Sequence, residues 1–170
     1  MIHRDAAGHG LKNTRWIREE VVLILANDLA ALDASRPELE RFFAAHNLDP
    51  VVSHRIDVIF EELASNAIRH GFTPGSGQSV RVRLRAGASQ VELTFEDDGP
   101  PFNPIERAEP QAFRSLKDAA LGGLGISLVR KLSTAMRYKR LSPPAASNGE
   151  AGVFRPVNRV IVTVARAASG

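Results

Sequence analysis

The most informative segment of the sequence for the fold has ten residues, Glu62-Leu63-Ala64-Ser65-Asn66-Ala67-Ile68-Arg69-His70-Gly71. It closes a segment, residues 51–71, in which apolar residues recur with helical spacing, and glycine is common just past a helix C-terminus. The spacing therefore predicts a helix over this segment. On a helical wheel its buried stripe contains Ile56, Phe60, Leu63, Ala64 and Ala67.

Two polar residues lie beside the buried stripe of this helix. Glu62 and Asn66 are one turn apart and line up with His70, whereas Glu61 points nearly the opposite way, into solvent. A carboxylate and an amide at the edge of a core are costly to desolvate unless they hold something. An ordinary amphipathic helix with a polar edge is the alternative, and for His70 the alternative is a favourable position near the helix dipole.

A second group of polar residues, Glu96-Asp97-Asp98-Gly99, directly follows a predicted strand. A carboxylate at this point can accept a hydrogen bond from the exocyclic amine of adenine, and Gly99 permits a close backbone approach. We assign the binding role to Asp97, which stands two residues before Gly99, and a solvated turn position to Asp98. A plain turn is the alternative.

The third segment, Gly122-Gly123-Leu124-Gly125, leads into a predicted helix. Small residues at a helix start leave backbone N–H groups free at the positive end of the dipole, which favours phosphate. The chain contains no GxxxxGK[ST] and no strand–GxGxxG–helix unit, so a P-loop and a Rossmann domain are excluded.

Composition limits the remaining possibilities. The chain has 170 residues, 44% of them hydrophobic, with a formal net charge of +3 and no cysteine. Disulfides and thiol chemistry are excluded, and so small a charge surplus does not indicate nucleic-acid binding. The longest apolar run has six residues, and no secretory signal is evident. We expect one cytoplasmic domain of ordinary size.

The order of elements predicts the fold class. Residues 1–20 are expected to form an N-terminal lead-in, and residues 21–166 a single domain. Residues 143–156 form a connection. The predicted order is strand, helix, helix, hairpin, loop, helix, strand, strand, which favours a two-layer α/β sandwich with a mixed, mostly antiparallel sheet and helices on one face. The helix predicted over 29–48 has an alternative start at Ser35, because Pro37 suits a first turn.

The three segments together resemble the Bergerat-fold ATP-binding domains of gyrases and histidine kinases. The order of an Asn box, a DxG box and a glycine box is most similar to bacterial anti-sigma-factor serine/threonine protein kinases. That resemblance covers about residues 21–166 and implies that they form a single ATP-binding kinase-like domain with a lid at about 100–121. One box departs from the family pattern: Val157-Asn158 stands where the family often has a Gly-Thr or Gly-Asn pair before the last strand.

The resemblance implies ATP and Mg²⁺ as cofactors and a role for each motif residue. Glu62 would be the catalytic base, Asn66 would ligate the metal, and Asp97 with Gly99 would bind adenine. The glycine box would cradle phosphates through the backbone amides of Gly122, Gly123 and Gly125.

The resemblance also implies a function in bacterial transcription regulation. We expect a protein kinase that binds a sigma factor and/or an anti-sigma-factor antagonist protein and phosphorylates the antagonist, with no direct contact to nucleic acid or membrane. A homodimer is left open. The alternative is an ATP-binding interaction module without significant kinase activity, and a structural domain that binds no nucleotide is a third reading. Arg81, Arg83 and Arg85 alternate on one strand, which is usually a solubilising pattern, with partner docking as the alternative.

Overall fold

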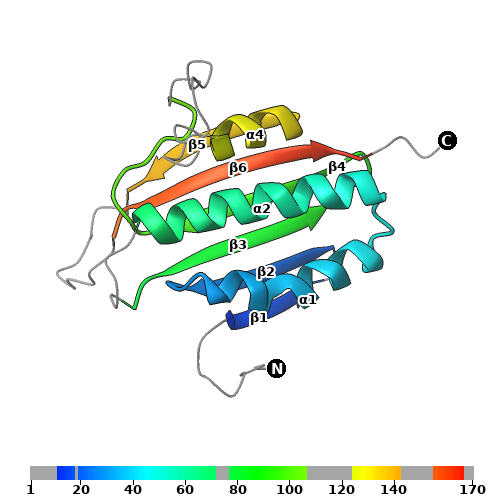
Figure 1. Ribbon diagram of the computed structural model, residues 1–170, viewed down its shortest axis with the longest axis horizontal. Coiled ribbons are helices and arrows are strands. Elements are labelled where there is room, and N and C mark those ends of the chain that lie inside the picture. The colour runs from blue at the N-terminus through cyan, green and yellow to red at the C-terminus, as the bar shows by residue number, and fades with distance from the viewer. Residues whose placement is uncertain (1–10, 18, 72–76, 107–123, 143–154, 167–170) are drawn as a thin grey trace, which may run out of the picture.

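One layer of the molecule is a six-stranded antiparallel sheet (Figure 1). The computed structural model describes residues 11–17, 19–71, 77–106, 124–142 and 155–166. The strand order across the sheet is β1-β2-β3-β4-β6-β5, and every pairing is antiparallel. The strands are β1 (Leu11–Ile17), β2 (Glu20–Ala26), β3 (Ser79–Ala86), β4 (Gln90–Asp97), β5 (Ala135–Leu141) and β6 (Val157–Ala165).

The described helices form the second layer. They are α1 (Ala30–Ala45), α2 (Pro50–Gly71) and α4 (Leu124–Leu132), and Figure 1 shows α1 and α2 lying across one face of the sheet. Helix α2 contacts β3, β4 and β6 as well as the neighbouring α4. The predicted two-layer α/β sandwich is therefore confirmed, with a described sheet that is antiparallel throughout rather than mixed.

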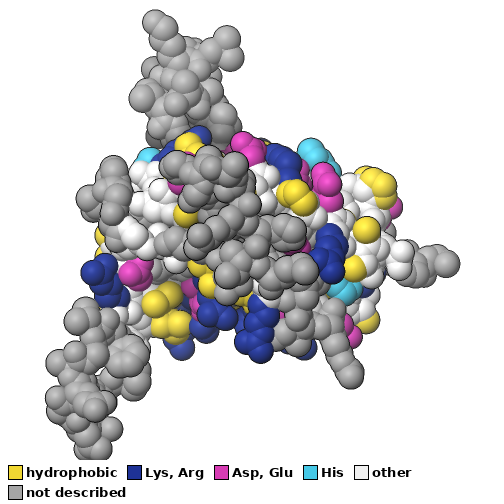
Figure 2. All heavy atoms as spheres, turned by 90° about the horizontal axis from the view of Figure 1, so that it is seen from below, with side chains coloured by type: hydrophobic (Ala, Val, Ile, Leu, Met, Phe, Trp, Pro, Cys, Tyr) yellow, Lys and Arg dark blue, Asp and Glu magenta, His cyan; other side chains and the backbone are white. Residues whose placement is uncertain are grey.

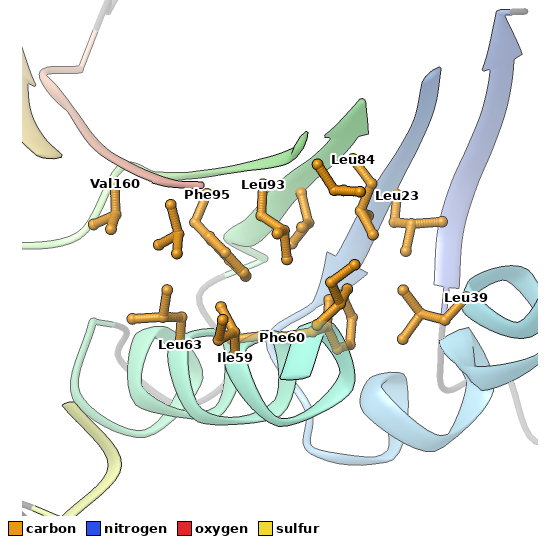
Figure 3. Packing of buried hydrophobic residues seen from close by; sticks show 14 of the residues in the cluster. Leu23, Leu39, Ile59, Phe60, Leu63, Leu84, Leu93, Phe95 and Val160 are labelled. Carbon is orange, nitrogen blue, oxygen red and sulfur yellow. The ribbon is translucent and has the colours of Figure 1, made fainter. Parts of the chain in front are cut away.

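Alternating strand residues and the helical stripe build the core between these layers. Val80, Val82 and Leu84 of β3 face the helices and are fully buried, while the arginines between them face away. In Figure 3, Phe60 and Leu63 of α2 point toward the residues of the neighbouring strands. Aliphatic and aromatic burial of this extent supplies most of the stabilising free energy of such a domain.

The helix that carries the Asn box agrees with its prediction. All five residues of the predicted stripe lie in or against the hydrophobic cluster, with Ala67 only partly buried. The helix includes Gly71 at its C-terminal end, and Arg69 and His70 lie in its last turn, where positive charge interacts favourably with the dipole.

The N-terminal part differs from one prediction and agrees with another. The expected lead-in over residues 1–20 contains strand β1, which pairs with β2 from Leu11 to Ile17. The helix predicted over residues 29–48 is confirmed as α1, and the alternative start at Ser35 is wrong: α1 begins at Ala30, whose N–H donates to Asp28 Oδ1 at 3.0 Å, and Pro37 lies inside the helix. Among the described residues, no helix has the length and apolar character needed to cross a membrane.

Candidate nucleotide site

The two adjacent glutamates of α2 have different surroundings. Glu61 is exposed and pairs with Arg36 of α1 at 3.5 Å. Glu62 is half-buried and lies one turn before Asn66, which is half-buried too. The helix thus presents Glu62 and Asn66 along one edge of its buried stripe, as the spacing of the sequence predicts.

The carboxylate of Glu62 meets the start of α4. A Cβ atom on Gly125 would overlap Glu62 Oε2 and would lie 2.9 Å from Glu62 Cδ. Gly125 is in the first turn of α4, so the absence of a side chain is what lets the carboxylate reach this turn. The contact joins the Asn box and the glycine box, which are about sixty residues apart in sequence.

The rest of the glycine box lies outside the described residues. That applies to Gly122 and Gly123, and to most of the predicted lid, of which residues 100–106 are described. In the described part, the Arg130 guanidinium of α4 donates to the backbone oxygens of Pro104 (3.1 Å) and Ile105 (2.7 Å). The first residues of the predicted lid are therefore held against α4.

A second set of contacts gathers where α2 ends. A Cβ atom on Gly99 would overlap the carbonyl oxygen of Gly71 and would lie 2.9 Å from Asp97 Oδ1. The turn that carries Asp97 can therefore approach the end of α2 only with glycine at position 99. Gly71 and Glu62 are nine residues apart on α2, which corresponds to roughly 14 Å along the helix axis. The two polar regions thus lie at separate points along one helix, with Asn66 between them.

Asp97 is oriented by two hydrogen bonds. The Gly99 N–H donates to Asp97 Oδ1 at 3.0 Å, and the side-chain amide of Asn158 donates to the same oxygen at 2.9 Å. Among the described residues both bonds end on Oδ1, so Oδ2 is the oxygen left for an amine donor from a ligand. Burial raises the pKa of Asp97, although both hydrogen bonds and the nearby Arg140 act in the opposite direction.

Asn158 lies at the centre of the hydrogen bonds around Asp97, a role that its position in the sequence does not indicate. Its amide group donates to Asp97 and to the carbonyl oxygen of Pro100 (2.8 Å). Its Oδ1 accepts from Arg140 (2.7 Å), from the Tyr138 hydroxyl (2.9 Å) and from a backbone N–H. Asn158 is 2% exposed, so β6 carries a buried polar centre that joins the end of β4, the turn after it and β5.

Asp98 takes part in a different set of contacts. Its Oδ1 accepts a hydrogen bond from Gln78 at 3.1 Å, and its Oδ2 lies 3.7 Å from an Arg155 guanidinium nitrogen. Asp97 and Asp98 therefore face different neighbours, and of the two only Asp97 takes part in the hydrogen bonds with Gly99 and Asn158.

Comparison with protein-family models gives one match over residues 25–147, to the histidine kinase-like ATPase domain. The match spans well over half of the chain. The chain belongs to the histidine kinase-like ATPase domain family. Membership of a histidine kinase-like ATPase domain family implies that the chain binds ATP.

Two curated proteins similar to this histidine kinase-like ATPase domain carry functional names. The "Serine/threonine-protein kinase BtrW" of Bordetella bronchiseptica is 35% identical over 80 residues, which is 47% of this chain and 56% of that protein. The "Anti-sigma F factor" of Pasteuria penetrans is 26% identical over 95 residues, which is 54% of this chain and 63% of that protein. The chain thus matches less than two thirds of the length of either relative.

Among solved structures, the histidine kinase domain of the blue-light activated histidine kinase EL346 from Erythrobacter litoralis is similar at 15% identity, with a TM-score of 0.44. The similarity covers 82% of this chain and 61% of that one.

Proposed function

We propose that this histidine kinase-like ATPase domain is an ATP-dependent protein serine/threonine kinase and a regulator of the anti-sigma-factor type. The observation that carries the proposal is the contact between the Glu62 carboxylate and the first turn of α4 at Gly125, one helical turn from Asn66. The contact joins an acid to the start of a helix, and Asn66 adds an amide one turn along α2; phosphoryl transfer from ATP uses groups of these kinds near the phosphates.

The side chains near Asn66 are suited to a metal ion that is ligated mainly by the phosphates of ATP. Among the described residues there is no group of three or more His, Cys, Asp or Glu side chains that could hold a metal by itself. Mg²⁺ takes one or two protein oxygens and completes its shell with phosphate oxygens and water, so the amide oxygen of Asn66 fits it. When bound, the metal would neutralise charge on the phosphates during transfer.

The chemical step needs a group that accepts a proton from the substrate hydroxyl. In this proposal, Glu62 accepts that proton while the serine or threonine oxygen forms a bond to the γ-phosphorus. The bond from the γ-phosphorus to the bridging oxygen breaks, and ADP leaves with the electron pair. At the other end of α2, Asp97 holds the adenine amine through the oxygen that Asn158 and Gly99 leave open.

The partner half of the proposal draws on the names of the relatives. One relative is a serine/threonine-protein kinase and the other an anti-sigma factor. We extend these to a chain that binds a sigma factor and phosphorylates an antagonist protein on serine or threonine.

The test combines the purified chain, γ-labelled Mg-ATP and the antagonist-type proteins encoded by the same genome, followed by phosphoamino-acid analysis. Glu62→Gln is expected to lower the phosphorylation rate by about 100-fold or more while ATP affinity changes little, because general-base catalysis is worth about 10²–10⁴ in rate. Glu61→Gln is the matched control, since Glu61 is exposed on the other side of the helix and should leave the rate unchanged.

Two results would contradict the proposed catalysis. Absence of phosphoserine and phosphothreonine with every partner, while ATP still binds, would remove the kinase activity. If the Glu62→Gln variant regulates the partner as well as the unmodified chain does, catalysis is not needed. The chain would then act as an ATP-binding interaction module.

A further inference from the structure

The face of the sheet that the helices do not cover is strongly basic. Alternate residues of each strand point onto this outer face, because their neighbours point into the core. The central row crosses all six strands and consists of Arg15, Val22, Arg83, Thr94, Ile161 and Arg137. This row has three arginines and no acid. Adjacent strands are about 4.8 Å apart, so Arg15 and Arg137 each lie roughly 10–14 Å from Arg83 along a nearly straight line.

The neighbouring rows increase the charge of the outer face. One row contains Arg81, Glu96, Arg159 and Lys139 in register across four strands, with both Arg81 and Arg159 paired to Glu96. The row on the other side contains Arg85 between two glutamates, Glu20 and Glu92.

The described strand residues of this face thus include seven basic and three acidic side chains. Their surplus of four positive charges exceeds the +3 of the whole chain, so the rest of the chain is slightly acidic. In Figure 2, several Lys and Arg side chains lie along the lower side of the molecule.

Some like charges on this face lie directly opposite one another on adjacent strands, and their repulsion lowers the stability of the sheet. Lys139 lies directly opposite Arg159 on adjacent strands, an arrangement that destabilises a sheet. The exposed side chains of Arg15, Arg137 and Lys139 make no hydrogen bond or ion pair with the described part of the chain. An anionic partner would relieve this repulsion.

The centre of the face differs from its basic surround, because it contains buried and apolar side chains. Thr94 is 2% exposed, and its Oγ1 is buried with no hydrogen-bond partner among the described residues. Val22, its neighbour but one in the row, is 6% exposed and yet lies outside the hydrophobic cluster under the helices. Ile161, directly opposite Thr94 in the row, is partly exposed, so the face has a small accessible apolar contact surrounded by basic side chains.

We infer that the outer face of the sheet docks a protein partner through a segment that places carboxylates around a small apolar contact. The inference rests on the partner-binding half of the proposed function and locates it on the side of the sheet opposite Asp97 and Glu62. Asp97 shares the helix-covered side with Phe95, two residues earlier on β4. A partner docked there would leave the nucleotide site accessible.

Other occupants fit the face less well. Glu20, Glu92 and Glu96 would repel a continuous phosphate backbone, and the described strand residues of this face include no aromatic side chain on which bases would stack. The described large hydrophobic residues that are exposed lie elsewhere, so nothing here would enter a lipid layer. A second copy through the same face would bring two positive surfaces together.

The test uses the full chain and a fluorescent peptide of about 18 residues with Glu and Leu at helical spacing, roughly five turns long. Its comparisons are the same peptide with Gln for Glu, a single-stranded DNA and vesicles of phosphatidylcholine with phosphatidylserine. We expect the acidic peptide to bind at least tenfold more tightly than its Gln counterpart, and to weaken as NaCl rises from about 50 to about 300 mM.

Matched charge reversals show whether the face itself is responsible. Arg83→Glu with Arg137→Glu is expected to weaken peptide binding about tenfold or more, since two close charge contacts are lost. Arg41→Glu with Arg55→Glu changes the net charge equally, but on exposed positions of the two helices, and should change binding less than twofold. Circular dichroism and thermal unfolding of both variants establish that they are folded.

The inference is overturned if both pairs weaken binding equally, if DNA or vesicles bind more tightly than the peptide, or if the face drives self-association instead. ATP binding is measured on the same samples. If the unmodified chain binds ATP but not the acidic peptide, the docking surface alone is overturned. If the unmodified chain fails to bind ATP, the proposed kinase is overturned and the docking result stands.

Discussion

Gly125 and Glu62 lie so close together that only one of them can have a side chain at the point of contact. A methyl group at position 125 would overlap the Glu62 carboxylate, the flexible end of that side chain. The carboxylate can move aside, so we expect Gly125→Ala to fold. Its rate of phosphorylation should fall by up to about 100-fold, because a shift of about 1 Å in a reacting group has that effect.

This comparison is made by measuring kcat and ATP affinity for each variant. Gly87→Ala is the control, since Gly87 lies in the turn between β3 and β4 and its Cβ would meet only the Gln90 carbonyl oxygen at 3.2 Å. Equal losses in both variants would mean that the Glu62 contact is not responsible.

Asp97 illustrates how a binding residue can reduce stability. Its pKa is raised by burial, so in the nucleotide-free protein the folded state holds the proton more tightly than the unfolded state does. The stabilising contribution of Asp97 is therefore complete at low pH, where it is protonated in both states. It is lost as pH rises from the ordinary aspartate range through the raised pKa.

We expect Asp97→Asn to remove this dependence, because an amide oxygen still accepts from Gly99 and Asn158 without carrying charge. Relative to the unmodified chain, the variant should become more stable as pH rises from acid to neutral, measured by urea unfolding at a series of pH values. Its ATP affinity should fall about tenfold or more, as a charge-assisted hydrogen bond is worth about 1.5–3 kcal/mol. Asp98→Asn is the control. If Asp97→Asn became less stable relative to the unmodified chain as pH rises, the predicted direction of the pH dependence would be wrong.

At the scale of elements, β6 holds the site together through Asn158. It joins the end of β4, the turn that follows and β5 by hydrogen bonds, and a neighbouring bond from Arg140 reaches the Gly99 carbonyl oxygen at 2.8 Å. The orientation of Asp97 is thus determined by three elements and not by the DxG box alone.

Removal of that amide should be costly. Asn158→Ala leaves the Tyr138 hydroxyl and Asp97 Oδ1 each short of one partner, and each buried group left unpaired costs about 1–3 kcal/mol. We expect a loss of at least about 2 kcal/mol in the free energy of unfolding, together with weaker ATP binding. Tyr138→Phe removes one bond and should cost about 0.5–1.5 kcal/mol, measured by the same denaturant titration. Similar values for the two variants would show that Asn158 is not the centre of the network.

At the scale of the whole molecule, ligand binding and stability are linked. Mg-ATP at about 100 times its Kd should raise the free energy of unfolding by about 2.7 kcal/mol, visible as a higher Tm. Asn66→Ala should retain the effect of ATP without metal and lose the additional effect of Mg²⁺, because Asn66 supplies the protein ligand in the proposed site. Ser53→Ala, near the other end of α2, is the control.

Removal of Mg²⁺ with EDTA tests the same role of Asn66 by taking the metal away from the Mg-ATP complex. The unmodified chain should lose part of its ATP-dependent stabilisation, and Asn66→Ala should lose nothing more. A variant that still responds fully to Mg²⁺ would mean that another group holds the metal.

Sequence patterns were enough to predict the elements whose residues repeat with a local period. The apolar period of α2 predicted which side of that helix is buried, and hence that Glu62 and Asn66 share an edge while Glu61 does not. The alternation in β3 and β4 predicted their hairpin. Periodicity works here because one face of each element lies against the core, and a repeat of 2 or 3.6 residues records that face.

Strand β1, the Asn158 hydrogen bonds and the Glu62–Gly125 contact could be seen only in the folded structure. Strand β1 has too little apolar alternation to be seen alone and exists because β2 offers it an edge to pair with. The role of Asn158 depends on pairings that bring together residues 97, 138 and 158, and the Glu62–Gly125 contact depends on α2 packing against α4. Such contacts join residues far apart in the chain, and no local period encodes which distant backbone or side chain will complete a hydrogen bond.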